Sequence, residues 1–354
     1  MEIFFTYLQR AGSENLTQTY LEGKTRPCFS CEIVSLGGAV HFYIWMSQAK
    51  FKNIIEAQLY AQYPNIEIYE VKEDYTNKVF FDEEKYPMFG RQHRLSKPDA
   101  YPIKTYIDYG LDKDQEEEYK IDPLTPIVEY MGTLKKGEYA WLQILIQKHE
   151  EETLFHGRLT KEREWVKDID KEIKKVRESA MQGSGDEENK FRFPNPTKGQ
   201  NEIIAALERS KGKMAFDCMI RSVYIAEKAS FTPANISGLT GCLRQYGSNL
   251  LNRFGTSHNT GTSDVWKDVL TVLPFLKAME ARKVSRLKRD LLHAYKLRSF
   301  FEWPYKHLGG SKPFVLTTEE LATVFHFPSG IVSQTPTLTR VPSKKSEAPA
   351  NLPI

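Results

Sequence analysis

The sequence lacks the short motifs that identify many enzymes. It contains no GxxxxGK[ST] phosphate-binding loop, no G-x-S-x-G turn and no dinucleotide-binding glycine pattern. His149-Glu150 has no second histidine at the spacing of a zinc protease. Catalytic carboxylates leave no short signature, so an enzyme with an unrecognised site stays an alternative. The absences nevertheless favour a protein without catalytic activity, and they predict no cofactor.

Cysteine is scarce. Four cysteines in 354 residues do not make a disulfide scaffold, which favours a reducing, cytoplasmic setting. Cys28 and Cys31 have CxxC spacing and are a weak candidate metal pair, but no second ligand pair follows at a comparable spacing. Chance placement and a redox motif are the other interpretations, and chance placement is favoured because the pair leads into a strand rather than a helix.

Long apolar runs and a strong net charge are also missing. No run approaches the roughly 20 apolar residues that span a bilayer. The net charge of +3 is too small to imply a polyanionic partner by itself. Composition therefore predicts an ordinary soluble protein, and the chain is long enough for two or three domains with cores of their own.

The clearest structural pattern lies in residues 29–75. Gly37-Gly38 separates two apolar runs, which predicts a β-hairpin because glycine adopts positive φ without steric cost. After the turn, an aliphatic set alternates with an aromatic set and should face a core: Val40, Phe42, Ile44 and Met46. A helical period follows and stops at Pro64, and alternation resumes over 66–71.

A strand predicted at Ile3–Leu8 and a helix at Asn15–Leu21 complete the order β-α-β-β-α-β for residues 1–75. This is the split βαβ, or ferredoxin-like, order. Residues 76–101 are expected to form an irregular connector.

A second ferredoxin-like unit is predicted for residues 102–328. Its expected strands are 103–110, 139–147, 214–225 and 314–317, and its expected helices are 123–131 and 233–246. Long insertions fall at 150–200, which includes a charged helix over 158–180, and at 257–312. The glycine-rich stretch 255–263 is expected to be a loop, since no GK[ST] follows it. Residues 329–354 are rich in Pro, Ser, Thr and Lys, which predicts a disordered tail. The predicted fold class is α+β.

A charge pattern with helical geometry spans residues 282–298. Its main basic stripe falls within an arc of about 80° at 100° per residue, opposite an apolar side. The candidate partner-binding residues are Arg282, Lys283, Arg286, Lys288, Arg289, Lys296 and Arg298. Three interpretations stay open: a solvated face of a packed helix, a contact with nucleic-acid phosphates, and a contact with an anionic membrane surface or an acidic protein.

Several stretches together resemble a known group of proteins: EIVSLGGAVHFYIW with AQLYAQYPNIEIYEV, DPLTPIVEYMGTLKKGEYAWLQILIQ, KPFVLTTEELATVFHFPS and RVPSKKSEAPANLP. They resemble the domain of unknown function that precedes the motor in HerA–FtsK-type, conjugation or type IV secretion-like ATPases of candidate-phyla bacteria. The resemblance spans roughly residues 29 to 353, and its motifs are structural rather than catalytic.

The resemblance implies a non-catalytic accessory or docking module of a DNA-translocation or secretion machine. Its implied partners are a P-loop motor ATPase, DNA, a membrane complex and further copies in an oligomeric assembly. The implied location is cytoplasmic or peripheral at the inner face of the membrane. The motor's nucleotide-binding loop is absent from this sequence, so we expect the motor to be a separate chain or a missing C-terminal domain. A nucleic-acid-binding module that uses residues 282–298 is the alternative function.

Overall fold

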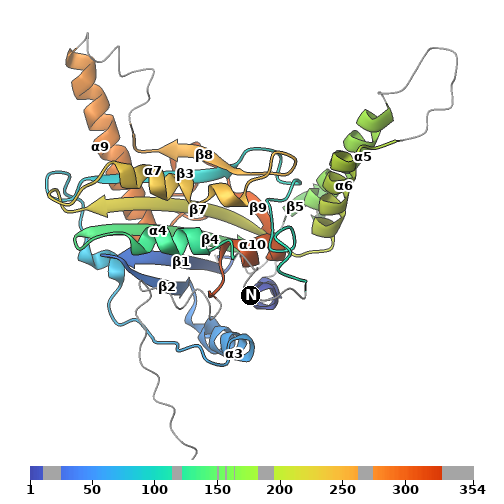
Figure 1. The fold of residues 1–354 in the computed structure, drawn as a ribbon, viewed down its shortest axis with the longest axis horizontal. Helices are drawn as coiled ribbons and strands as arrows, with labels where there is room; N and C mark the ends of the chain where they lie inside the picture. The colour runs from blue at the N-terminus through green and yellow to red at the C-terminus, as the bar shows by residue number, and fades with distance from the viewer. Residues whose placement is uncertain are drawn as a thin grey trace, which may run out of the picture.

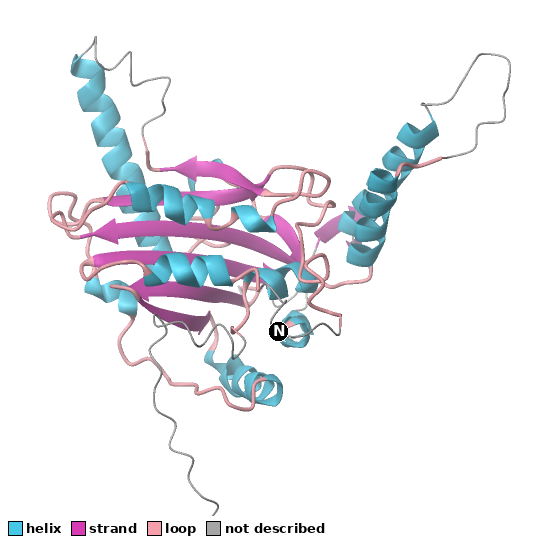
Figure 2. Cartoon of the chain, in the orientation of Figure 1, coloured by secondary structure: helices cyan, strands magenta, loops and turns pink. Residues whose placement is uncertain are grey.

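One antiparallel sheet joins strands from both halves of the chain (Figures 1 and 2). The computed structural model describes residues 1–10, 25–113, 122–149, 151–155, 158–162, 164–181, 195–261 and 274–328. The strand order is β2-β1-β4-β7-β3-β8, and β9 pairs with part of β7. The bounds are β1 Cys28–Leu36, β2 Ala39–Met46, β3 Met88–Leu95, β4 Glu138–Lys148, β7 Ala215–Ala226, β8 Phe254–Asn259 and β9 Phe314–Thr317. A hairpin of β5 (Glu151–Phe155) and β6 (Arg158–Glu162) forms its own small sheet.

The predicted hairpin is confirmed. β1 and β2 pair in antiparallel register from Leu36↔Ala39 onward, so Gly37-Gly38 is a two-residue turn with both φ angles positive. A Cβ on Gly38 would lie 2.5 Å from the carbonyl oxygen of Leu134, so the turn also needs a residue without a side chain. The aliphatic set of β2 faces the main core, with Val40 buried.

Helices cover both faces of the sheet. The face with the larger core packs against α1 (Glu2–Arg10), α3 (Lys52–Gln62), α4 (Thr125–Gly132), α7 (Ala234–Gly241) and α10 (Thr318–Val324). The opposite face packs against the C-terminal half of α9 (Pro274–Lys296). Helices α5 (Glu164–Met181) and α6 (Lys198–Lys211) lie side by side and extend away from the sheet (Figure 1).

The first predicted strand is wrong, because residues 3–8 belong to helix α1. Aromatic and β-branched residues favour a strand locally. In the structure, however, Phe4, Phe5 and Leu8 are buried together in the main core, and positions 4 and 8 are one helical turn apart. Tertiary packing outweighs the local preference.

Two further predicted strands do not form: residues 66–71 are irregular, and residues 106–110 of the predicted strand 103–110 form a turn. Residues 66–69 alternate between half-buried and exposed, residues 70 and 71 are exposed, and none of them pairs with a strand. In the segment 103–109, backbone N–H groups donate to side chains or to a turn instead of to a strand: Ile103 to Glu320 Oε1, Tyr106 to Thr323 Oγ1 and Lys104 to the Tyr246 carbonyl. These three backbone N–H groups are therefore satisfied without a sheet.

The expected connector and one expected loop supply strands instead. The connector 76–101 contains β3, and the stretch 255–263 begins within β8. Because β1, β4 and β7 are neighbours, the strands assigned to two units share one sheet. The structure is therefore a mixed α/β architecture around one antiparallel sheet, not two separate ferredoxin-like units. The predicted helix 15–21 and the tail 329–354 lie outside the described residues.

The remaining strands and several helices are confirmed with small shifts. β4, β7 and β9 match the predicted strands 139–147, 214–225 and 314–317. α4 matches the predicted helix 123–131, whereas the predicted helix 233–246 ends as α7 at Gly241 and continues as a short 3-10 turn at Arg244–Tyr246. The predicted helix 158–180 divides into β6 and α5.

Candidate nucleic-acid interface

Helix α9 packs against the sheet only with its C-terminal half. Leu291, Leu292 and Tyr295 are buried with Trp141 and Val223 of the sheet. Residues 277–290 are exposed or half-buried throughout, and Met279 is 63% exposed. Figure 1 shows this half of the helix extending past the sheet. We call residues 277–290 the α9 arm.

The α9 arm is rich in basic residues. It contains Lys277, Arg282, Lys283, Arg286, Lys288 and Arg289, against the acids Glu280 and Asp290. Asp290 lies 3.6 Å from Arg286 and 3.7 Å from Arg289, so one carboxylate serves two guanidinium groups. Exposed pairs of this kind contribute little free energy. The arm therefore keeps a positive surface.

Arg282, Lys283, Arg286 and Arg289 are exposed on the arm. Arg282 has no ion pair among the residues that the structure describes. The spacing of Arg282, Arg286 and Arg289 puts them on one helical face, as the sequence predicts. The structure therefore brings these three predicted side chains together on an accessible surface.

Two other candidates are engaged within the protein. Lys288 forms an ion pair of 2.8 Å with Glu83 and is mostly buried. Lys296 donates a hydrogen bond to the carbonyl of Val79. Both side chains tie α9 to residues 79–83, which pack beneath it, and neither is presented to solvent as the exposed arginines are.

Arg298 is a correction to the predicted interface. Its side chain is only 7% exposed and forms ion pairs with Glu32 and Asp74. These two carboxylates raise the pKa of Arg298 further above its already high value, against the opposing effect of burial, so it stays charged. A buried, doubly paired guanidinium is not available to a phosphate. Arg298 instead belongs to a buried network with Glu32 and Arg221 that holds the C-terminal end of α9 to the sheet, which we call the root of the arm.

Backbone geometry explains why Arg298 points inward. Ser299 N–H donates to the Ala294 carbonyl and Arg298 N–H to the Tyr295 carbonyl, each at 3.0 Å, which is the Schellman arrangement that ends a helix. The arrangement needs a left-handed residue at Arg298, where φ is 49°. Glycine is the usual residue there, and arginine pays a steric penalty of roughly 1–2 kcal/mol. The ion pairs of its side chain offset that penalty.

Glu32 is the centre of the root. It is fully buried in β1, and both carboxylate oxygens are occupied. Oε1 accepts from Ser30 at 2.7 Å, from Gln143 at 2.9 Å and from Arg298 Nε at 3.1 Å. Oε2 accepts from Tyr75 at 2.8 Å and from Arg298 Nη2 at 3.1 Å. A buried carboxylate is tolerated only with such a full set of partners.

Arg221 of β7 supports the same helix end. It is fully buried, and its guanidinium donates to the carbonyls of Ala294 at 3.3 Å and Ser299 at 2.8 Å. A cation is favourable beside the free carbonyls of a helix C-terminus. No carboxylate contacts Arg221 among the described residues, and burial lowers its pKa to about 9. Two buried arginines therefore fix the base of the arm.

Sequence reasoning missed this root. Glu32 and Arg221 each stand alone as charges inside an apolar strand run, FSCEIVSL and CMIRSVYIA. A charged residue in a buried strand needs a partner, so each was a signal for an internal network. Both residues contact the segment at the end of α9. That segment is far away in sequence, and nothing in its pattern marks it as their partner.

The weak metal candidate is not assembled. Cys28 and Cys31 lie three residues apart in β1, so their side chains point to opposite faces of the sheet. Burial raises the pKa of both thiols, that of Cys28 to about 12. No cluster of three or more His, Cys, Asp or Glu side chains suited to a metal occurs in the described part of the chain.

Among the described residues, no helix combines the length and apolar content needed to cross a bilayer. The longest helix in that part of the chain, α9, contains the basic arm instead.

A family model described as a domain of unknown function, DUF8128, matches residues 9–339. No curated protein and no solved structure matches the chain. The family match does not include a link to HerA–FtsK-type ATPases, so that setting remains a proposal. Because the matched region covers most of the 354 residues, the chain belongs to the DUF8128 family.

Proposed function

We propose that this chain is a non-catalytic accessory module of a DNA-translocation or type IV secretion-like ATPase machine, and that its α9 arm contacts DNA. The observation that supports the DNA contact is the face of exposed arginines on a helix whose C-terminal end is fixed to the sheet. The sequence resemblance supports the setting and a P-loop motor ATPase as the partner.

The geometry of the arm suits a phosphate backbone. Arg282 and Arg289 are seven residues apart, or roughly 10 Å along a helix. Duplex DNA carries about six phosphate charges over that length. Arg286 lies between them on the same face. Such contacts position a protein on DNA without reading its sequence, so the proposal predicts binding with little sequence preference.

The firm attachment of α9 to the sheet suits the arm to a role in a DNA-moving machine. A motor that moves DNA needs accessory contacts whose position is fixed relative to the rest of the machine. The paired Arg298 and the buried Arg221 hold the end of α9 to the sheet, and Lys288 holds its middle to Glu83. The arm is thereby presented at a set angle rather than on a free tether.

The DNA contact is tested by charge reversal. The variant R282E/R286E/R289E should bind a fluorescent duplex at least about tenfold more weakly at low salt, because three phosphate contacts become repulsions. The matched control K171E/K174E/K175E makes the same change in net charge on exposed positions of α5, and it should keep near-normal affinity. Equal losses in the two variants would show that only net charge matters and would remove the interface.

The motor partner is tested by co-purification from the native cell, with half of the lysate treated with nuclease. Recovery of a P-loop ATPase that survives nuclease supports the accessory role. Recovery of nuclease-sensitive material alone leaves DNA binding as the function and removes the motor. Recovery of nuclease-resistant partners that include no ATPase, with an unchanged yield in R282E/R286E/R289E, contradicts the proposal.

A further inference from the structure

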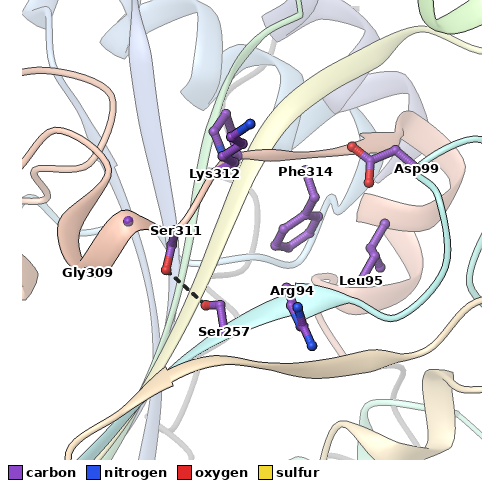
Figure 3. Close-up of a pocket in the computed structure, with 10 residues that line it drawn as sticks. Arg94, Leu95, Asp99, Ser257, Gly309, Ser311, Lys312 and Phe314 are labelled. Carbon is purple, nitrogen blue, oxygen red and sulfur yellow. Dashed lines mark hydrogen bonds between the residues drawn. The ribbon is translucent and has the colours of Figure 1, made fainter.

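The sheet forks at β7, away from the α9 arm. Residues 221–225 of β7 pair with β3, whereas residues 215–218 pair with β9. The pairing of β3 with β7 ends at Gln92, where its register with β8 also shifts, and β3 continues beside β8 alone. A cavity of about 370 Å³ opens at the fork (Figure 3), within the size range of small-molecule sites.

Charged groups of both signs line this cavity. Arg94 of β3 and Lys312 of the segment before β9 are exposed, and Asp99 is half-buried. In Figure 3, the Asp99 carboxylate and the Lys312 side chain stand on either side of the Phe314 ring. No ion pair joins Asp99 to Lys312 or to Arg94 in the described structure, so the opposite charges lie more than 4 Å apart.

Asp99 has one oxygen engaged and one left for a ligand. Its Oδ2 accepts the backbone N–H of Val315 at 3.0 Å, in place of the strand that is missing at the fork. Burial raises the pKa of Asp99, because a carboxylate withdrawn from water is costly to charge. A ligand cation beside Oδ1 would reduce that cost.

Two buried apolar side chains and one hydrogen bond define the floor and one wall of the cavity. Leu95 and Phe314 are buried apolar residues and supply the floor. Ser311 donates to Ser257 Oγ at 3.0 Å, which closes the wall between β8 and the segment before β9 (Figure 3). A Cβ on Gly310 would meet no atom within 4 Å, so this side of the cavity is open to entry.

Two buried polar side chains at the end of the β3–β7 pairing also have unpaired atoms. Gln92 lies two residues before Arg94 on the same face of β3 and is fully buried. Neither polar atom of its amide has a hydrogen-bond partner among the described residues, and the same holds for Nε of Arg221, which is opposite Gln92 in the register. Neither residue lines the cavity, so their unpaired atoms are a feature of the neighbouring sheet and not of the site itself.

We propose that the cavity at the sheet fork binds a small zwitterion of the α-amino-acid class with an apolar side chain. The ligand carboxylate lies between Arg94 and Lys312, the ammonium group lies against Asp99, and the side chain packs on Leu95 and Phe314. This assignment is independent of the DNA contact, because none of these residues belongs to the α9 arm.

The test is calorimetric titration of the full chain with leucine and with two analogues that each lack one charge. N-acetyl-leucine lacks the ammonium group and leucinamide lacks the carboxylate. Leucine should bind with a dissociation constant of about 1 mM or below, and each analogue should bind at least tenfold more weakly. The variant D99N keeps an acceptor for Val315 and should lose the preference for leucine over N-acetyl-leucine. The variant R94Q should lose the preference for leucine over leucinamide.

The control is K306Q, which removes an exposed cation that does not line the cavity, and it should bind leucine normally. Equal binding of leucine and both analogues would overturn the proposal, as would leucine binding that neither D99N nor R94Q changes. Absence of heat and of any thermal shift with leucine, phenylalanine and valine would overturn it too. Binding of the acetylated analogue alone would show a simple anion site instead.

Discussion

Replacement of Arg298 by methionine removes the counter-charge from the root of the α9 arm. In the native protein, Arg298 donates two hydrogen bonds of 3.1 Å to the Glu32 carboxylate and also pairs with Asp74. Methionine keeps a long apolar stem but leaves the Glu32 carboxyl group fully buried and without a cation. The remaining donors, Ser30, Gln143 and Tyr75, are neutral.

The expected loss of stability follows from that unpaired carboxyl group. Removal of one partner from a buried ion pair costs about 3–5 kcal/mol. The left-handed backbone at position 298 is equally strained for methionine and arginine, so it does not contribute to the difference. We therefore expect R298M to lower the free energy of unfolding by about 3–5 kcal/mol.

Urea unfolding followed by circular dichroism measures this loss. The control is R286M on the same helix, whose side chain is 76% exposed and whose loss should stay within about 0.5 kcal/mol. In the double variant E32Q/R298M the unpaired carboxyl group is gone, so its loss should be smaller than the sum of the single losses by about 0.5–3 kcal/mol. A loss below 1 kcal/mol for R298M, or strict additivity, would refute the account of the root.

Two further predictions concern other parts of the fold. Burial raises the pKa of Glu320 in α10 to about 7, so the folded state holds its proton more tightly than the unfolded state. The resulting stability is present below about pH 4.5 and is lost as pH rises through 7. The urea stability of E320Q relative to the native protein should therefore improve by on the order of 3 kcal/mol from pH 4.5 to pH 8, and a pH-independent difference would contradict the assignment. In the hairpin turn, G38A should cost at least about 2 kcal/mol more than G110A in thermal unfolding, because both glycines have positive φ but only the Cβ at 38 meets a backbone oxygen. Equal costs would show that the contact with Leu134 relaxes freely.

The parts of the fold that the sequence predicts well are those that local pattern determines. The Gly37-Gly38 turn sets the β1–β2 register by itself, and β4 and β7 are long apolar runs that have few alternatives to a buried strand. The turn residues and the apolar runs are each local features of a few consecutive residues. The sequence alone is therefore enough to predict these elements.

The missed elements depend on contacts between distant segments. β3 contains Arg91, His93 and Arg94, which argue against a strand, yet His93 is buried and bonded to Ser222 of β7 at 2.9 Å. Burial lowers the pKa of His93 to about 3, so it is neutral in the sheet. β3 is held between β7 and β8, and the contact with Ser222 lets a histidine lie in a buried strand, which no local pattern in the sequence indicates.

The candidate interface likewise has one part that local spacing predicts and one part that depends on distant contacts. Helical spacing alone placed Arg282, Arg286 and Arg289 on one face, and they are exposed together in the structure. Arg298 follows the same helix closely in sequence, and the helix end together with the carboxylates of Glu32 and Asp74 holds it inward. Spacing predicts which side chains share a face but not where the helix stops.

We propose that the three exposed arginines of the α9 arm, Arg282, Arg286 and Arg289, contact DNA phosphates. The most direct measurement is the dependence of duplex affinity on salt for the native protein and for R282Q/R286Q/R289Q, a variant that removes the charges without reversing them. Each lost phosphate contact lowers the slope of log affinity against log salt by about 0.9. The two slopes should differ by nearly 3 if all three arginines contact phosphates, and identical slopes would show that none of them does.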